Sequence, residues 1–428
     1  MSLDIDRIRQ QFPALQLKDD GKPRIYFDNP GGTQVPQQVI QRMRDYLINA
    51  NANHGGYFRT SRVSDAILEE AHLAMADFLN ANSPQEIIFG PNMTTLTFAI
   101  SRSLAHWFKT GDEIILTKMD HDGNVAPWIQ VAQEKGLKIK WLNFQTDSYH
   151  YDYQQLEELL SSRVKLLAIN YASNAIGTIN DIQRVVEMAH QNRTLVYVDA
   201  VQYVPHAPTN VQALGCDFLV CSAYKFFGPH QGILWGRYEL LEKLPAYKVR
   251  PADTYPPGKF ETGTQCHEGQ AGTLGALEYL SWIGQIMAQD YHQKFSNFSG
   301  RKLFLHAAMQ AVKEYEKSIS RHLINGLSNI KKIKIHGITD NSELEKRVPT
   351  ISFCMDGVYP AEIARHLAAE NIFVWDGHYY ALEVIRHLGL EKQGGMLRIG
   401  AVHYNTMDEI DRLLNSLELF CHNEIIIP

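Results

Sequence analysis

Cysteine is scarce in this sequence, and the few cysteines follow no pattern that would pair them or bind a metal ion. Only five of the 428 residues are cysteine, an odd number, and none shows the close paired spacing of a zinc site. Cys221 and Cys354 lie inside apolar runs, where a small buried side chain is the expected role. We therefore expect neither a disulfide framework nor a metal site.

Long apolar runs and blocks of like charge are also missing. No uninterrupted apolar stretch is long enough to span a bilayer, and the N-terminus carries early acids in place of the apolar core of a signal peptide. The formal net charge is −6, whereas a nucleic-acid-binding protein normally carries a basic patch. The sequence therefore predicts a cytoplasmic protein that has neither nucleic acid nor membrane as a partner.

Short β-like runs alternate with helical stretches through the first two-thirds of the chain. This alternation is typical of an α/β fold with a mostly parallel sheet covered by helices on both faces. The link between the last two runs is short and contains Gly228 and Pro229, which favours an antiparallel final strand, because a parallel crossover needs a dozen or more residues. The seven predicted strands are 86–89, 113–116, 139–142, 165–169, 195–198, 218–221 and 233–235, with helices at 62–80, 152–161 and 181–191 between them.

The chain is too long for one compact core, and its pattern changes near residue 270. A helical region over residues 269–330 is followed by a second, smaller set of elements. Strands are predicted there at 333–335, 350–353, 372–374 and 397–399, and helices near 359–369 and 408–420. We predict an N-terminal segment (1–24) that packs on the small domain, a large cofactor-binding domain (25–270), and a connecting helix with a smaller α/β C-terminal domain (271–428).

Lys225 is the most informative residue of the chain. It follows the apolar run 218–221 and lies among small and aromatic residues that would keep its amine out of water, while Asp199 ends the apolar run 195–198. Each residue alone is more often a solvated loop residue or a cap. Together they meet the needs of pyridoxal phosphate, because the lysine can form the Schiff base and the carboxylate can keep the pyridine nitrogen protonated. Desolvation would also lower the pKa of the lysine and leave its amine neutral near pH 7.

Four segments resemble, in order, signatures of the class V aminotransferases. They are residues 26–33 (YFDNPGGT), 120–128 (DHDGNVAPW), 198–202 (VDAVQ) and 222–225 (SAYK). The sequence is most similar to the branch of cysteine desulfurases and selenocysteine lyase-like proteins, from about residue 25 to about residue 415. The resemblance implies fold type I of the pyridoxal phosphate enzymes, with a seven-stranded sheet, and a homodimer with composite active sites.

The cofactor-binding residues follow partly from chemistry and partly from this resemblance. A phosphate is bound by backbone N–H groups at a helix start together with hydroxyl groups, and Asn92 with the three residues after it fits that need, although threonines there also serve as ordinary caps. The resemblance implies that His121 stacks over the pyridine ring and moves a proton, which makes it catalytic with Lys225 and Asp199. The cofactor-binding residues that it implies are Met93, Thr94, Thr95, His121, Asn174, Asp199, Gln202, Ser222, Tyr224, Lys225 and, reaching the partner's phosphate, Thr264.

The substrate side of the site is implied by the same resemblance. Arg398 matches the arginine that grips the α-carboxylate of an amino acid, a contact that suits a planar guanidinium, although a strand arginine can also lie on the surface. Two neighbouring glycines beside His54 permit a close backbone approach. The substrate-binding residues expected are Gly31, Gly32, His54, Arg59, His378, Tyr380 and Arg398.

One departure from the family pattern bears on the reaction. The loop that carries the sulfur-accepting cysteine in the desulfurases has Tyr380 at that position here, and no cysteine lies within ten residues of it. A phenol with a pKa near 10 cannot accept sulfur as a thiolate does. Cys266 is the only cysteine near a predicted cofactor-binding segment.

These observations favour a pyridoxal phosphate-dependent lyase or transferase that acts on a small amino acid. The most economical reaction is cleavage of a C–S or C–Se bond by β-elimination. A racemase or epimerase, and a true cysteine desulfurase that uses another cysteine, are alternatives. A cofactor-binding regulatory protein with little catalysis is an alternative of another class, against which Lys225, Asp199, His121 and Arg398 speak.

Overall fold

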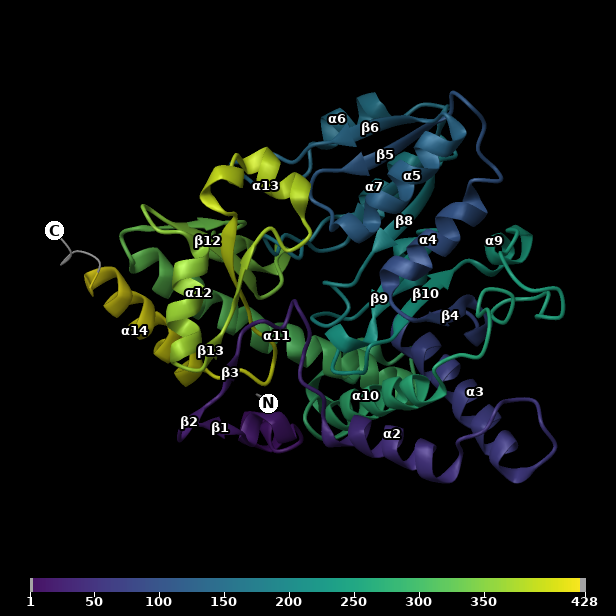
Figure 1. Cartoon of the computed structure of the whole chain (residues 1–428), viewed down its shortest axis with the longest axis horizontal. Helices are drawn as coiled ribbons and strands as arrows, with labels where there is room; N and C mark the ends of the chain where they lie inside the picture. The colour runs from purple at the N-terminus through teal and green to yellow at the C-terminus, as the bar shows by residue number, and fades with distance from the viewer. Residues whose placement is uncertain (1–2, 424–428) are drawn as a thin grey trace.

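Two α/β bodies, one larger than the other, lie side by side in the computed structural model (Figure 1). The structure describes residues 3–423. The remaining residues, 1–2 and 424–428, belong to the predicted N-terminal and C-terminal segments and lie outside the described residues. Within the described part of the chain, no helix is long and apolar enough to cross a membrane.

The larger body is built on a seven-stranded sheet with the strand order β4-β10-β9-β8-β7-β5-β6. The strands are β4 (Ile87–Gly90), β5 (Glu113–Thr117), β6 (Lys138–Leu142), β7 (Val164–Asn170), β8 (Leu195–Asp199), β9 (Phe218–Ser222) and β10 (Gly232–Gly236). Strand β10 runs antiparallel to both of its neighbours, whereas β6, β5, β7, β8 and β9 pair in parallel. This sheet confirms the predicted mostly parallel architecture, including its antiparallel last strand.

Helices cover both faces of the large sheet, because successive side chains of its strands point to opposite sides. In β9, Leu219 and Cys221 pack toward one helical layer, and Phe218 and Val220 pack toward the other. One layer contains α4 (Met93–Leu104), α5 (Ala126–Lys135) and α9 (Tyr238–Lys243). The other contains α3 (Arg59–Leu79), α7 (Ile182–Gln191), α8 (Val211–Leu214) and α10 (His267–Ile286), while α6 (Tyr153–Leu159) lies near β6.

The smaller body has an antiparallel four-stranded sheet with the order β11-β12-β15-β14. Its elements are β11 (Ile333–His336), β12 (Thr350–Met355), α12 (Pro360–Ala369), β14 (Trp375–Gly377), α13 (Leu382–Leu388), β15 (Met396–Gly400) and α14 (Met407–Asn423). Sequence reasoning missed β14 and α13. The predicted strand at 372–374 forms β13 (Ile372–Phe373) outside this sheet, where it pairs in parallel with β3 (Ile25–Tyr26).

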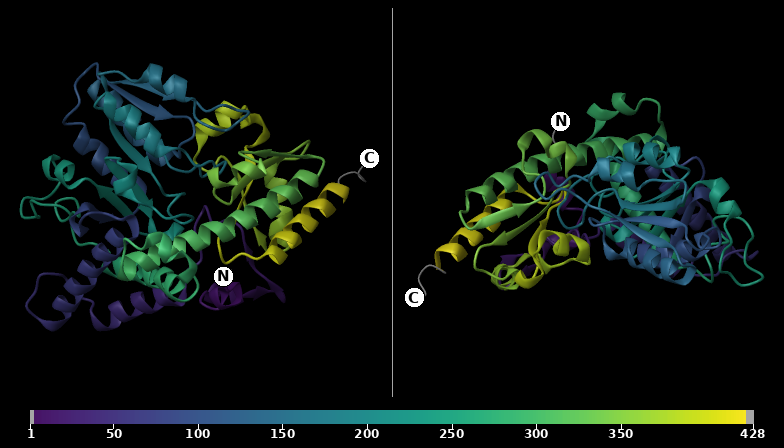
Figure 2. Two further views of the ribbon diagram at one scale, coloured as in Figure 1. Left: turned by 180° about the vertical axis from the view of Figure 1, so that it is seen from behind. Right: turned by 90° about the horizontal axis from the view of Figure 1, so that it is seen from above.

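A single long helix, α11 (Gly300–Asn329), joins the two bodies (Figure 2). Its first half contributes Leu305 and Met309 to the large core, and its second half contributes Leu323 and Leu327 to the small one. The two hydrophobic cores are therefore connected by one continuous helix.

The N-terminal segment contacts both bodies. It contains α1 (Ile5–Arg9), the short strands β1 (Lys18–Asp19) and β2 (Lys22–Pro23), and leads through β3 to α2 (Gln37–Asn49). Phe12 packs edge-on against Phe227 of the larger body and Tyr404 near α14, and Arg9 pairs with Glu409 of α14 at 2.9 Å. The segment thus packs at the seam between the two bodies.

Gly284 of α10 lies directly against the backbone of α11, and this contact yields a first prediction. A Cβ at this position would overlap with the backbone of Phe304, so Gly284→Ala should lower the free energy of unfolding by about 1–3 kcal/mol through overpacking. Urea denaturation followed by circular dichroism measures this change. Gln285→Ala, on the exposed face of the same helix turn, is the control and should stay within about 0.5 kcal/mol of the parent. Equal stabilities for the two variants would contradict the contact.

Candidate active site

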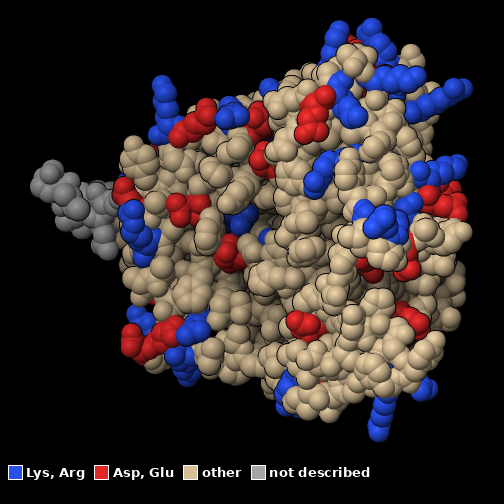
Figure 3. Space-filling view, turned by 45° about the vertical axis from the view of Figure 1, so that its right-hand side comes forward, with Lys and Arg blue, Asp and Glu red and all other residues tan. Residues whose placement is uncertain are grey.

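A cavity of about 320 Å³ lies where the carboxyl ends of the parallel strands meet the small body. Ligands of open α/β sheets bind at this edge of the sheet. Figure 3 shows a hollow in this face of the molecule, in which basic and acidic side chains lie next to each other. Its walls come from the ends of β5, β7 and β8, from the start of α4, and from β14 and β15.

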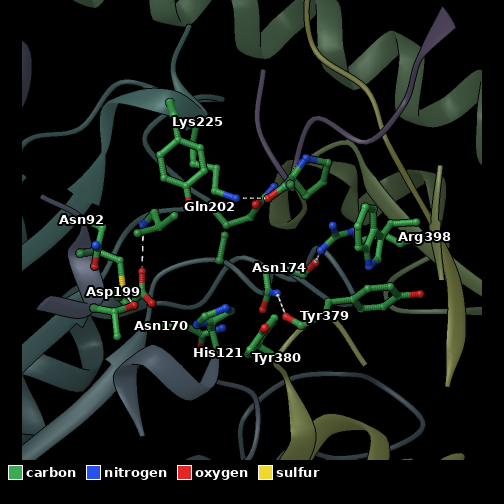
Figure 4. Close-up of a pocket in the computed structure, with 18 of the residues that line it drawn as sticks. Asn92, His121, Asn170, Asn174, Asp199, Gln202, Lys225, Tyr379, Tyr380 and Arg398 are labelled. Atoms are coloured by element: carbon green, nitrogen blue, oxygen red, sulfur yellow. Dashed lines mark hydrogen bonds between the residues drawn. The ribbon is translucent and has the colours of Figure 1, made fainter. Parts of the chain in front are cut away.

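Many of the predicted site residues line this cavity, and their labelled side chains surround one space (Figure 4). Those that line it are Gly31, Met93, Thr94, His121, Asn174, Asp199, Gln202, Tyr224, Lys225, Tyr380 and Arg398. The wall also contains Asp28, Pro30, Asn92, Asn170, Ala172, Val201, Trp375 and Tyr379. The cavity therefore joins segments from residue 28 to residue 398 of the chain.

The Lys225 amine is held in a poorly solvated position. Lys225 ends a 3-10 turn (Ala223–Lys225) directly after β9, and its Nζ donates a hydrogen bond to the backbone oxygen of Pro30. The pKa of Lys225 is lowered to about 7, chiefly by burial and to a smaller extent by the charge of Arg398, which together outweigh the opposing effects of Asp28 and Asp199. A neutral, nucleophilic amine is therefore present at neutral pH.

Asp199 ends β8, the strand next to the one that leads to Lys225. Its side chain is buried, which raises its pKa to about 6, while the Val201 N–H at 2.9 Å and the charge of Lys225 act in the opposite direction. At pH 7 the carboxylate form prevails, so the cavity contains a buried anion for a cationic group of a ligand.

His121 lies after β5 on the same edge. Its Nδ1 accepts a hydrogen bond from the Gly123 N–H at 2.9 Å, and its ring lies 5.6 Å from the Tyr380 ring at an interplanar angle of 31°. The pKa of His121 is lowered to about 4, chiefly by burial and also by the charges of Lys225 and Arg398. The imidazole is therefore neutral at pH 7.

Arg398 enters the cavity from β15 and is held by both bodies. One amino group of its guanidinium pairs with Asp28 Oδ1 at 3.1 Å, the other donates to the Asn174 backbone oxygen at 3.1 Å, and the group lies 4.4 Å from the Tyr379 ring centre. Its buried Nε has no partner among the described residues. Burial raises the pKa of Asp28, although the charge of Arg398 acts in the opposite direction. Asp28 lies in the 26–33 segment but was not predicted as a site residue, because a lone acid after a two-residue strand shows no periodicity.

The loop of residues 377–381 covers the cavity and is tied to the large body through its backbone. The carbonyl oxygens of Tyr379 and Tyr380 accept hydrogen bonds from the Asn174 side chain at 2.9 Å and from the Asp122 N–H at 2.7 Å. Both tyrosines have left-handed backbone conformations, with φ of 54° and 58°. Tyr379 is buried, whereas the Tyr380 side chain is 67% exposed at the mouth of the cavity.

Seven predicted site residues do not line the cavity of their own chain. Gly32 packs next to Tyr224, buried Ser222 ends β9, and Thr95 is exposed in the first turn of α4. The others are all exposed: His54 and Arg59 lie before and at the start of α3, His378 lies in the covering loop, and Thr264 lies before α10. Arg59 lines a separate groove between α2 and α3 with Arg42 and Arg62.

The residues present fit pyridoxal phosphate. Buried polar atoms that have no partner among the described residues include Ser222 Oγ, Asn174 Oδ1 and Arg398 Nε, and such atoms call for a polar ligand. The N-terminus of the 12-residue helix α4, capped by Asn92 through the Thr95 N–H at 2.8 Å, is suited to an anion. Lysine, carboxylate, phosphate cradle and arginine thus surround one cavity.

Comparisons with known proteins agree with this site. The sequence matches the family described as aminotransferase class-V over residues 25–413. It is 30% identical to a cysteine desulfurase of Serratia proteamaculans over 98% of both chains, and 30% identical to the aminotransferase-like protein FGM3 of Gibberella zeae over 98% of both chains. The apo structure of a cysteine desulfurase from Thermococcus onnurineus superposes with a TM-score of 0.86 at 25% identity, covering 99% of each chain.

The fold and the cavity define a fold type I enzyme of the pyridoxal phosphate-dependent class. More specifically, the chain belongs to the class V aminotransferase family, and its relatives include proteins named cysteine desulfurase. The resemblance drawn from four sequence segments is thereby confirmed, as is the expectation of an enzyme of this family.

The neutral state of Lys225 can be tested in the protein without cofactor. Acetylation of Lys225 under a brief pulse should be half-maximal at about pH 7, because the neutral amine reacts and burial has lowered its pKa from that of an ordinary lysine. Mass spectrometry of the peptide that contains Lys225, across pH 5 to 11 (roughly the span of lysine and histidine titration), gives the profile. Exposed Lys18 in the same digest is the control, and coincident profiles for the two lysines would refute the shift.

Proposed function

We propose that this protein is a pyridoxal phosphate-dependent enzyme that cleaves the C–S or C–Se bond of a small amino acid by β-elimination. The observation that carries the proposal is a cavity with Lys225, Asp199 and Arg398 in its walls but no thiol, although all five cysteines lie in the described part of the chain. An elimination needs a base, a carboxylate anchor and a leaving group, but no sulfur acceptor.

Different residues of this chain would bind the phosphate, the ring nitrogen and the ring face of the cofactor. The start of α4, with Met93 and Thr94 in the cavity wall, would hold the phosphate. Ser222 does not line the cavity, but its buried Oγ has no partner among the described residues and would add a second hydroxyl contact. Asp199 would hold the proton of the ring nitrogen, and neutral His121 would cover the ring. When bound, pyridoxal phosphate supplies an electron sink for the substrate α-carbon.

Substrate chemistry would use two further residues. Arg398 would orient the α-carboxylate through its free Nε and its remaining N–H groups. The neutral Lys225 amine would take the α-proton onto Nζ, while the Cβ–S bonding pair leaves with the sulfur. With L-cysteine and water, the balanced products are pyruvate, ammonia and sulfide.

The cysteines support this reaction over a persulfide route. Burial raises the pKa of Cys216 and Cys221 well above the ordinary value and raises that of Cys354 to about 11, so these thiols are protonated at pH 7. Cys266 is exposed before α10, but burial and Glu268 raise its pKa as well. Reactive thiolates instead need surroundings that lower the pKa.

Product analysis separates the candidate reactions. Cofactor-loaded protein is incubated with L-cysteine, L-cystine, L-selenocysteine and a panel of other amino acids. Elimination yields pyruvate and ammonia together with sulfide from L-cysteine, cysteine persulfide from L-cystine or selenide from L-selenocysteine, whereas a desulfurase yields alanine and a racemase yields the opposite enantiomer. We expect the keto acid, and alanine or a racemised amino acid as the main product would replace the proposed reaction.

A cysteine-free variant tests whether the reaction needs a thiol of the protein. Replacing all five cysteines by alanine or serine should leave turnover within about threefold of the parent, with a stability loss of about 1 kcal/mol at each buried site. The matched control restores Cys266 alone. Loss of turnover in the folded, cofactor-loaded cysteine-free protein, with recovery when Cys266 returns, would establish Cys266 as a sulfur acceptor.

We propose further that the enzyme acts in the cytoplasm as a homodimer with composite active sites. Three predicted site residues, His54, Arg59 and Thr264, lie outside the cavity of their own chain. Large apolar side chains are exposed nearby on α2 and before α3, among them Ile48 at 70% and Tyr57 at 93%. Such a patch is typical of a protein interface, and a dimer would bring these segments to the partner's cavity.

Mixed dimers test this arrangement. Lys225→Ala and Thr264→Ala are each expected to be inactive or weak, because one lacks the amine and the other the phosphate contact. Random mixing should restore about a quarter of the wild-type sites, since half of the dimers then carry one intact site of two. Differently tagged subunits allow the heterodimer to be isolated. A heterodimer no more active than the Thr264→Ala parent would refute shared sites.

A further inference from the structure

Two aromatic side chains are exposed at the mouth of the active-site cavity, and the proposed reaction assigns no role to either. Trp375 of β14 is 56% exposed and Tyr380 of the covering loop is 67% exposed, although both line the cavity. Apolar surface that borders a cavity and faces water is suited to an apolar part of a ligand. Asp199 and Arg398, by contrast, are buried in the same wall, so the cavity is charged inside and has an aromatic rim.

Trp375 is the direct cross-strand neighbour of Arg398. The two residues lie opposite each other in the antiparallel pair of β14 and β15. Their side chains therefore leave the same face of the small sheet, with Cβ atoms about 4.5–5.5 Å apart. The Arg398 guanidinium is held at the cavity by Asp28 and Asn174. The indole of Trp375 thus borders the place where Arg398 would bind the carboxylate of an amino acid.

Tyr380 borders the same space from the covering loop (Figure 4). The polar backbone groups of this loop are already engaged, because the carbonyl oxygens of Tyr379 and Tyr380 accept hydrogen bonds from the large body. The Tyr380 N–H donates to His378 Nδ1 at 3.1 Å, and the Tyr379 hydroxyl donates to the Met396 backbone oxygen. The loop therefore presents mainly aromatic surface to the cavity.

The two charged ends of an amino acid leave its side chain as the group that would reach this rim. The amine would meet the cofactor at Lys225, and the carboxylate would meet Arg398, while the cofactor itself would fill the buried space next to Asp199. The side chain would then extend toward Trp375 and Tyr380. A free thiol ends at its sulfur atom and covers little of either ring, whereas a substituent on the sulfur would cover more of both.

We propose that the substrate is an S-substituted cysteine whose apolar or aromatic substituent packs against Trp375 and Tyr380. This inference rests on the proposed β-elimination and narrows its substrate class. The Cβ–S bond breaks with its electron pair on the sulfur, and the α-proton goes to Lys225 Nζ. With water, the balanced products are pyruvate, ammonium and the free thiol that carries the substituent.

The proposed homodimer would add to this rim. The segment before α3 that would reach the partner's cavity contains Tyr57 and Phe58, which are 93% and 59% exposed. These rings would enlarge the apolar surface at the mouth. Arg59 follows them directly and would instead favour an acidic substituent, so an acidic substrate belongs in the test.

A series of S-substituted substrates tests the proposal by turnover. Pyridoxal phosphate-loaded protein is given L-cysteine, S-methyl-L-cysteine, S-benzyl-L-cysteine and S-carboxymethyl-L-cysteine, and the rate of pyruvate formation is measured. The value of kcat/KM for the S-benzyl compound should exceed that for the S-methyl compound on the order of tenfold, because covering the equivalent of about two methylene groups gives such a factor. Equal values, or a preference for the carboxymethyl compound, would overturn the proposal.

Two analogues that have CH₂ in place of sulfur separate binding from cleavage, because neither carries a leaving group. L-Norvaline replaces S-methyl-L-cysteine, and L-2-amino-5-phenylpentanoic acid replaces S-benzyl-L-cysteine. The phenyl analogue should bind to the cofactor-loaded protein on the order of tenfold more tightly than norvaline. The change in visible absorption with analogue concentration gives each Kd.

Trp375→Val and Tyr380→Asn each remove one ring of the rim. Valine keeps the strand propensity of β14, and asparagine suits the left-handed backbone at position 380. Each variant should reduce the preference for the phenyl analogue over norvaline by about threefold or more, the value of one aromatic contact. Tyr359→Leu is the matched control, because Tyr359 is 58% exposed on the small body but does not line the cavity. Its preference should equal that of the wild type, and an unchanged preference in both rim variants would overturn the proposal.

Failure of this inference can be told apart from failure of the proposed function. A preference for the phenyl analogue that the rim variants reduce, in a protein that forms no pyruvate from any substrate, would keep the aromatic rim and remove the β-elimination. Pyruvate from L-cysteine without any preference for the benzyl or phenyl compound would do the reverse. A wild-type protein that takes up no pyridoxal phosphate would overturn both.

Discussion

An amine that is held out of water needs hydrogen-bond acceptors and neighbouring negative charges from the protein itself. The residues around Lys225 meet this requirement. The Pro30 carbonyl takes one of its hydrogen bonds, and Asp28 and Asp199 offset part of the cost of its positive form. The lowered pKa of about 7 is the result of burial and of the nearby Arg398 charge, which outweigh these two acids. A more solvated lysine at this position would remain protonated and unreactive at neutral pH.

The charged groups around Lys225 also connect the two bodies. Arg398 belongs to the small sheet, but its partners Asp28 and Asn174 come from the segment before α2 and from the loop after β7. The Asn174 side chain in turn binds the covering loop. Arg398 is buried and Asp28 is partly exposed, and such a pair adds little net stability. The removal of Asp28 would nevertheless be costly, because the Arg398 charge would be left buried without its carboxylate partner. The contact between the bodies is thus specified by electrostatics as well as by packing.

Much of the fold could be predicted from the sequence, because buried parallel strands read as short apolar runs. The run at 165–169 became β7, and the run at 218–221 became β9, each within two residues of its observed end. Strand β14 (Trp375–Gly377) was missed because three residues at a sheet edge show no alternation. Asp199 was found because it directly follows one such run, and Lys225 because it lies just past another, after residues 222–224.

The rest of the site could not be predicted in this way. Asp28, Trp375 and Tyr379 reach the cavity from irregular segments and a short edge strand, where the sequence offers no periodicity. The contact between His206, in the loop after β8, and Glu316, in α11, joins residues 110 positions apart and forms only when these two segments pack together. Local patterns identify residues at strand ends, whereas contacts between distant segments follow only from the packing.

The covering loop has a consequence for engineering. It is anchored by the carbonyl oxygens of Tyr379 and Tyr380, groups that every amino acid possesses, so closure of the cavity does not depend on the Tyr380 side chain. Its left-handed backbone favours glycine or asparagine, which would relieve rather than worsen the local strain. The Tyr380 side chain can therefore be exchanged to reshape the entrance of the cavity, while the two backbone hydrogen bonds of the loop stay in place. This position can be varied in a library of variants that is screened for new substrate preferences.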